Sequence, residues 1–199
     1  ARFANVAFSD GSLLHGFNQR FAKNQPFSAP NDVKRYFVTP RESGELCLMS
    51  CIFGQNRDIF FPKPNKDLKL IKFSDIAIKY LKNKDIIPIE CQNEEHARSL
   101  NPTDKGWPCL FTKSNTTGEK DFEEFFTENE TLEMNKFKSI GIIKNKCLYD
   151  NDKLDEFEKS IYTMKSKGVW NKEDLVNIFV KTLPSFIHTE KGKFLDGKM

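Results

Sequence analysis

Arg35 lies where the sequence places a strand directly before a helix. Residues 33–38 read Val-Lys-Arg-Tyr-Phe-Val, a mixture of β-branched and aromatic residues that is typical of strands. Residues 39–42, Thr-Pro-Arg-Glu, match a helix start, with a threonine cap, a proline at the first helical position and a glutamate that closes a capping box. Ligands of α/β proteins bind at such junctions. Arg35 therefore either holds a phosphate through paired N–H groups or forms a surface salt bridge.

A second candidate is the turn Ser9-Asp10-Gly11-Ser12. Residues 1–8 predict a strand, and Ser12 can cap a helix with apolar residues at positions 13, 14, 17 and 21. Backbone N–H groups point outward where a strand, a turn and a helix start follow one another, which suits a phosphate or a polyol. One glycine and two serines are equally consistent with an ordinary turn, so both interpretations stay open.

Cysteines and histidines give no clear catalytic or metal-binding pattern. Cys47 and Cys51 are four residues apart on a predicted helix, but neither has a His or Cys at zinc-site spacing, so we expect them to pack in the core. His15, His96 and His188 are isolated in the sequence, and we expect structural roles for them. We predict no metal site.

Tyr80 and Lys84 have the Tyr-x-x-x-Lys spacing by which some oxidoreductases lower the pKa of a tyrosine. Tyr80 falls on the apolar side of a helix that we expect to be capped by Ser74, so we interpret it as a packing residue. The sequence contains no glycine-rich phosphate loop, which argues against a dinucleotide bound here in the usual way.

The remaining elements alternate between strand and helix up to about residue 91. We expect further strands at 57–61, 68–72 and 86–90, a short helix from residue 94, loops around residues 101–102, 105–108 and 115–118, an acidic Phe-rich segment at 121–133, and amphipathic helices at 152–165 and 171–183. The second of these has Asn171 as its cap and Asp174 at the third helical position. This order predicts an α/β architecture followed by a helical part.

The amino-acid composition of the chain argues against a nucleic-acid-binding protein and against a membrane-spanning one. The chain has 31 Lys and Arg against 28 Asp and Glu, interspersed along the sequence, which disfavours a nucleic-acid binder. No apolar run approaches the length of a membrane span. Five cysteines without a regular framework predict reduced thiols in a cytoplasmic protein. The first residue is Ala1 in a strand-like stretch, and we expect the chain to be a fragment.

Several of these segments together resemble one known family. The quoted motifs occur in the same order in the second half of nucleotide-sugar dehydratases and epimerases of bacterial polysaccharide biosynthesis: Arg2-Phe-Ala-Asn-Val6, Ser9-Asp-Gly-Ser12, Arg35-Tyr-Phe-Val-Thr39, Asp58-Ile-Phe-Phe-Pro-Lys63 and Gly118-Glu-Lys120. These enzymes belong to the extended short-chain dehydrogenase/reductase superfamily. The chain looks most like the soluble UDP-N-acetylglucosamine 4,6-dehydratases, over about residues 1–125, and residues 192–199 look like the tail of one subgroup.

The resemblance implies a fold and a division of the chain. Residues 1–125 would be the sugar-nucleotide-binding portion, with residues 1–8 as one strand of a Rossmann sheet whose N-terminal half is absent. Residues 126–199 would be a helical extension and tail. The intact enzyme would take hydride from C4 of the sugar onto NADP or NAD, eliminate water across C5 and C6, and return hydride to C6. The cofactor loop and the catalytic residues would lie upstream of Ala1, so this fragment alone would be inactive and would bind no cofactor.

The resemblance also assigns substrate contacts by motif position. Asn5 would lie at the strand end that faces the diphosphate, and Ser9 and Ser12 in the turn after it. Arg35 would hold the diphosphate or the uridine, and Glu119 the ribose hydroxyls. Two departures put the uridine contacts and the sugar in question, because many relatives have an arginine in place of Asp10 and an Arg-Pro pair in place of Thr116-Thr117.

Alternatives remain within and outside this enzyme class. A nucleotide-sugar epimerase would differ in the missing half. A non-catalytic sugar-nucleotide-binding or assembly module would have no Rossmann half at all. We expect a UDP-sugar and a second copy of the chain as partners, exposed apolar surface, and a tail from residue 192 that is mobile unless it docks on a neighbouring subunit.

Overall fold

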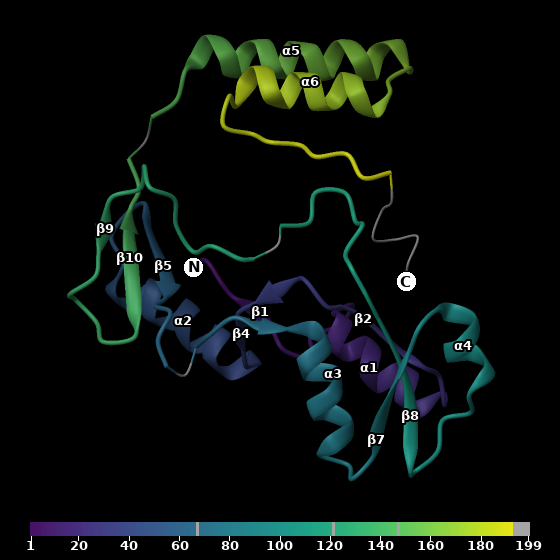
Figure 1. The fold of residues 1–199 in the computed structure, drawn as a ribbon. Coiled ribbons are helices and arrows are strands. Elements are labelled where there is room, and N and C mark those ends of the chain that lie inside the picture. Colours follow the sequence, from purple (N-terminus) through teal and green to yellow (C-terminus); the bar gives the residue numbers. More distant parts are fainter. Residues whose placement is uncertain (67, 121, 147, 193–199) are drawn as a thin grey trace. The chain divides into compact units, whose positions relative to one another are not determined.

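The computed structural model describes residues 1–66, 68–120, 122–146 and 148–192, so Asp67, Asp121, Cys147 and the tail residues 193–199 lie outside the described residues (Figure 1). The chain forms two compact units. Unit 1 comprises Ala1–Ser114 and Glu119–Asn145, and unit 2 comprises Asn115–Gly118 and the described residues from Lys146 onward. Residues 126–145, which we assigned to the helical extension, lie in unit 1.

Unit 1 has a mixed α/β fold, as predicted, and its sheets are small. Its strands are β1 (Asn5–Val6), β2 (Phe27–Pro30), β3 (Lys34–Arg35), β4 (Phe37–Val38), β5 (Asp58–Pro62), β6 (Ile71–Lys72), β7 (Ile87–Cys91), β8 (Gly106–Thr112), β9 (Leu132–Glu133) and β10 (Ile140–Lys144). Its helices are α1 (Leu13–Ala22), α2 (Pro40–Phe53), α3 (Phe73–Lys82) and α4 (Glu94–Ser99).

A parallel sheet with the order β2-β8-β7 carries the larger core (Figure 1). The buried faces of α1 and α3 pack against it through aromatic side chains. The rings of Phe17 and Phe27 stack with their centroids 4.9 Å apart, and those of Phe21 and Trp107 at 4.6 Å. The indole N–H of Trp107 donates to the carbonyl of Gln25 at 3.0 Å, so the buried ring leaves no unpaired donor.

An antiparallel sheet with the order β5-β10-β9 carries a second core. Because side chains alternate along a strand, Phe60 and Phe61 of β5 enter different clusters. Phe60 packs with Leu46 of α2, whereas Phe61 packs with Phe125. Both phenylalanines are fully buried, and Gly141 of β10 lies directly opposite Phe61 in the register.

Two short strand pairs hold the segment around Arg35. β1 runs parallel to β4, with Asn5 opposite Phe37, and β3 runs antiparallel to β6, with Arg35 opposite Ile71. Tyr36 lies between β3 and β4, and its carbonyl accepts a hydrogen bond from the backbone of Asn5 at 3.0 Å. At Tyr36 the chain therefore changes from pairing with β6 to pairing with β1.

Three strand predictions differ from this arrangement and are wrong. Residues 33–38 form two strands instead of one, because β3 and β4 pair in different sheets. Residues 1–8 pair as a strand only at Asn5–Val6. Residues 106–108, which we assigned to a loop, begin β8, the central strand of the parallel sheet, and the first four residues of β8 are buried.

Two side-chain predictions are also wrong. Helix α3 begins at Phe73, after Lys72, without a side-chain cap, and Ser74 is buried inside its first turn. Cys47 and Cys51 are exposed, because α2 turns Leu46 inward as its only buried residue. The described cysteines are all free thiols.

The predicted caps of α1 and α2 are confirmed. The Ser12 hydroxyl accepts from the backbone N–H of His15 at 3.1 Å. Thr39 and Glu42 form the complete capping box, in which the Glu42 carboxylate accepts from the Thr39 backbone N–H at 2.6 Å. The hydrogen bonds from Thr39 hold the pKa of Glu42 below its ordinary value.

Unit 2 contains the helices α5 (Asn151–Lys167) and α6 (Lys172–Thr182), which lie side by side. Asn171 and Asp174 form the predicted capping box at the start of α6. The rings of Phe157 and Phe179 meet edge to face at 5.5 Å. No residue of either helix is fully buried. No helix within the described residues is long and apolar enough to cross a membrane.

Candidate functional site

The Arg35 side chain occupies a nearly closed position on β3, where it is 11% exposed. Its Nη1 donates to the carbonyl of Lys34 at 2.8 Å. Its Nε lies 3.2 Å from Oε2 of Glu123, and its Nη2 lies 3.8 Å from Oε1 of Glu119. The guanidinium is therefore held by one carbonyl and faces two carboxylates that come from a distant part of the sequence.

Glu119 is positioned by a polar chain that begins in the loop before β3. The Asp32 carboxylate accepts from the backbone N–H of Ser114 at 2.9 and 3.1 Å. The Ser114 hydroxyl then donates to Oε2 of Glu119. Since Asp32 and Arg35 lie on one segment, and Ser114 and Glu119 on another, these contacts bind the two segments to each other at both ends. Glu119 is thus fixed on both of its oxygens and is 21% exposed.

The charges of this cluster leave it with excess negative charge. Arg35 supplies one positive charge, against the carboxylates of Glu119, Glu123 and Asp32. An arginine has five N–H donors, of which the Lys34 carbonyl and Glu123 engage two. The cluster can donate to an anion through Arg35 and accept hydrogen bonds from a diol through Glu119.

The turn between β1 and α1 holds two more of the predicted residues, Ser9 and Ser12. Ser9 donates its hydroxyl to the carbonyl of Val6 at 3.0 Å, and the Ser12 hydroxyl caps α1. Gly11 has a φ of +74°, a conformation that favours glycine. Both hydroxyls are thus used within the turn, as in an ordinary turn, while Asp10 and Gly11 are exposed.

The structure brings some of the predicted residues together. Arg35 and Glu119, 84 positions apart in the sequence, meet in one cluster. Asn5 adjoins this cluster through its backbone bond to Tyr36, the residue after Arg35. Within the described residues, no hydrogen bond or ion pair joins Ser9 or Ser12 to Arg35 or Glu119.

Tyr80 packs as predicted and is poorly suited to act as a base. Its hydroxyl donates to Oδ1 of Asn18 at 2.8 Å, and its ring meets those of Phe21 and Phe27 edge to face. Burial raises the pKa of Tyr80, the direction opposite to that required of a catalytic phenolate. The Lys84 ammonium lies over the Tyr80 ring, 5.4 Å from its centroid, instead of beside the hydroxyl.

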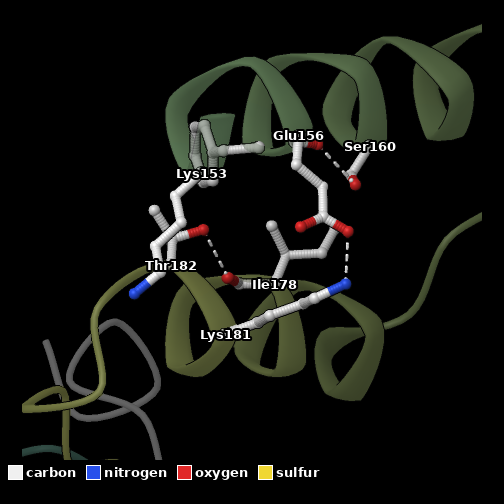
Figure 2. Close-up of a pocket in the computed structure, with 7 residues that line it drawn as sticks. Lys153, Glu156, Ser160, Ile178, Lys181 and Thr182 are labelled. Atoms are coloured by element: carbon white, nitrogen blue, oxygen red, sulfur yellow. Dashed lines mark hydrogen bonds and ion pairs between the residues drawn. The ribbon is translucent and has the colours of Figure 1, made fainter. Parts of the chain in front are cut away.

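A small cavity of about 20 Å³ lies between α5 and α6 (Figure 2). The Glu156 carboxylate and the Lys181 ammonium pair at its edge, and Ile178 forms part of its apolar wall. This volume suits about one water molecule and excludes a sugar nucleotide.

Glu123, Asp32 and Ser114 were missed by sequence reasoning. Residues 121–133 were predicted only as an acidic Phe-rich segment, without a partner for its carboxylates, whereas the structure places Glu123 against Arg35. The available signal was the four-residue spacing of Glu119 and Glu123, which places two carboxylates on one segment. Nothing in the local sequence indicates that this segment lies beside β3.

Comparison with known proteins gives one family match and several solved structures of similar fold. The family described as polysaccharide biosynthesis protein matches residues 1–145. No curated protein matches the chain significantly. Among solved structures, Pen from Bacillus thuringiensis is similar, with a TM-score of 0.52 and 19% sequence identity, over 75% of this chain and 39% of that chain. At this identity the likeness concerns the fold alone, and the chain spans well under half of the length of that structure.

Proposed function

Because the chain belongs to the polysaccharide biosynthesis protein family, we propose that it is the substrate-binding part of a nucleotide-sugar 4,6-dehydratase that acts on UDP-N-acetylglucosamine. The family membership itself gives a role in polysaccharide biosynthesis. The dehydratase reaction and the UDP-sugar are the proposal, and they apply to the whole enzyme, because this chain spans 39% of its structural relative.

The observation that carries the proposal is the meeting of Arg35 and Glu119, with Arg35 Nη2 and Glu119 Oε1 3.8 Å apart. A nucleoside diphosphate presents a doubly anionic diphosphate next to a ribose diol. An arginine is suited to the diphosphate through parallel N–H bonds, and a carboxylate is suited to the two ribose hydroxyls as an acceptor. Because Arg35 and Glu119 lie this close together, one ligand can place its diphosphate at Arg35 and its ribose at Glu119.

The remaining roles follow from the same proposal. Arg35 holds the diphosphate, and Glu119 accepts from the ribose hydroxyls. Asn5, beside the backbone that follows Arg35, and the turn of Ser9 and Ser12 contribute further contacts to the substrate. The Asp32–Ser114 chain orients Glu119 so that its carboxylate does not have to be ordered when the ligand binds.

A dinucleotide does not fit the residues described here. The β1–α1 turn has Gly11 as its only glycine, and the hydroxyls of Ser9 and Ser12 are engaged within the turn. We propose that the rest of the enzyme holds NADP or NAD. On this proposal the chain is the C-terminal part of an extended short-chain dehydrogenase/reductase that works as a cytoplasmic homo-oligomer, and the chain alone is inactive.

A second candidate is a nucleotide-sugar epimerase of the same superfamily. The Arg35–Glu119 pair favours a UDP-sugar but does not choose between the two reactions, because both use the same nucleotide. The intact enzyme distinguishes them by its product from UDP-N-acetylglucosamine, a 4-keto-6-deoxy sugar for the dehydratase and a stereoisomer for the epimerase. A non-catalytic sugar-nucleotide-binding or assembly module would give neither product.

Calorimetric titration of the 199-residue chain with UDP and UDP-N-acetylglucosamine tests the proposed site. We expect both ligands to bind and Arg35→Ala to abolish the heat of binding. Arg41→Ala is the matched control, because Arg41 is 88% exposed on α2 and pairs only with Glu45 in the same helix. Loss of binding in both variants, or no binding by the folded wild-type chain, would contradict a nucleotide site at Arg35.

A further inference from the structure

Glu123 occupies the part of Arg35 that a phosphate would use. Its Oε2 lies 3.2 Å from Arg35 Nε, closer than Glu119 Oε1 is to Nη2. The Nε and one Nη of an arginine form one of the two edges on which oxyanions bind with two parallel hydrogen bonds. A carboxylate and a phosphate therefore require the same donors at this edge.

The Glu123 side chain is also able to move away from Arg35. Its side chain is 40% exposed, against 11% for Arg35 and 21% for Glu119. The oxygens of Glu119 face both Ser114 and Arg35, whereas the contact described for Glu123 is the one with Arg35. Because exposed ion pairs contribute little free energy, replacing the contact between Glu123 and Arg35 by hydrogen bonds to water costs little.

We infer that Glu123 competes with the diphosphate of the ligand for Arg35 and so sets the affinity of the site for anionic nucleotides. This inference rests on the proposed function of the same site. When the diphosphate binds, its oxygens take the Arg35 N–H groups and the Glu123 carboxylate turns to solvent. Glu119 stays in place, held by Ser114, to accept from the ribose.

The competition has a definite sign and size. Replacing Glu123 by glutamine removes the negative charge that competes for Arg35, and the interaction of two unit charges about 4 Å apart near a protein surface is large enough for roughly tenfold tighter binding. Uridine has no phosphate, so its affinity should not change. A change in UDP affinity without a change in uridine affinity thus indicates competition for Arg35, whereas a change in both affinities indicates a general change in the site.

The experiment is calorimetric titration of wild type, Glu123→Gln and Glu124→Gln with UDP and with uridine. Glu124→Gln is the matched control, because it removes the same charge from the neighbouring residue, whose carboxylate is 49% exposed and pairs with Lys120 instead. We expect Glu123→Gln to bind UDP roughly tenfold more tightly than wild type, uridine binding to stay unchanged, and Glu124→Gln to remain within about twofold of wild type.

Three results decide the matter. Unchanged or weaker UDP binding by Glu123→Gln would overturn the inference alone and make Glu123 a residue that positions Arg35. Equal tightening in Glu124→Gln would overturn it in favour of a general charge effect. Absence of UDP binding by every folded variant would overturn the proposed function together with it. If Glu123→Gln does not fold, Glu123→Asp, which shortens the reach to Arg35, tests the same contact with the same expected direction.

Discussion

Replacing Gly141 by alanine tests the packing of β10 against β5. The register places Gly141 opposite Phe61, and a methyl group at Gly141 would lie 2.3 Å from Cζ and 2.8 Å from both Cε atoms of that ring. The Phe61 ring is fully buried, with the rings of Phe125 and Phe126 at centroid distances of 6.1 and 5.3 Å. The ring therefore has to move into space that other side chains fill.

The cost follows from two opposing effects. Forcing a methyl group into a packed core destabilises a protein by about 1–3 kcal/mol. Alanine also restricts the unfolded chain more than glycine does, which returns about 0.4–1 kcal/mol because the backbone at Gly141 does not have a positive φ. We expect a net loss of about 1–2 kcal/mol in the free energy of unfolding, measured by urea denaturation followed by circular dichroism.

Two further variants make this test specific. Gly44→Ala is the control, because Gly44 lies inside α2 with nothing within 4 Å of the added methyl group, and it should stabilise the protein by up to about 1 kcal/mol. Phe61→Leu should reduce the cost of Gly141→Ala in the double variant, since a smaller side chain makes room. Gly141→Ala with wild-type stability, or additive effects in the double variant, would refute the reasoning.

Three other predictions follow from local contacts. Thr39→Ala removes the capping box of α2 and should lower the free energy of unfolding by about 1 kcal/mol, whereas Thr39→Ser should retain most of it; urea denaturation measures both. Cys47 is exposed, while burial raises the pKa of Cys109 to about 12, so a thiol reagent at pH 8 should modify Cys47 and spare Cys109 until urea is added; equal labelling by mass spectrometry would contradict this. Arg2 donates two hydrogen bonds to the Glu130 carboxylate, from Nη2 to Oε1 at 2.9 Å and from Nη1 to Oε2 at 3.0 Å, and these hold the pKa of Glu130 below its ordinary value of 4.5. The Arg2–Glu130 pair should add up to about 1 kcal/mol to the free energy of unfolding above pH 4.5, and this contribution should disappear as the pH falls through the lowered pKa. Arg2→Gln should flatten this part of the curve of unfolding free energy against pH.

Local hydrogen bonding was predictable from the sequence. The caps Ser12, Thr39 and Asn171 are confirmed, because a capping side chain bonds to a backbone N–H only three residues away. The amphipathic helices of unit 2 follow for the same reason, since their periodicity is a property of neighbouring turns. The family resemblance, carried by short motifs in order, agrees with the family match over residues 1–145.

Strand partners could not be predicted in this way. Residues 105–108 include a glycine and a proline and were assigned to a loop, yet Gly106–Thr112 becomes the central strand because β2 and β7 pair on its two sides. The run Ile140–Lys144 is mostly apolar and fell within the expected helical extension, and only its pairing with β5 makes it a buried strand. Strand formation depends on residues far away in the sequence, whose positions local patterns do not encode.

The candidate site shows the same division. The sequence by itself placed Arg35 shortly before the capped helix α2 and, by resemblance, predicted that Arg35 and Glu119 contact one ligand. Only the tertiary structure decided that Glu123 holds the Arg35 guanidinium and that Asp32 reaches Glu119 through Ser114. The physical reason is that side-chain charges act through space, so their partners are known only after the fold has brought residues 32–35 and 114–123 together.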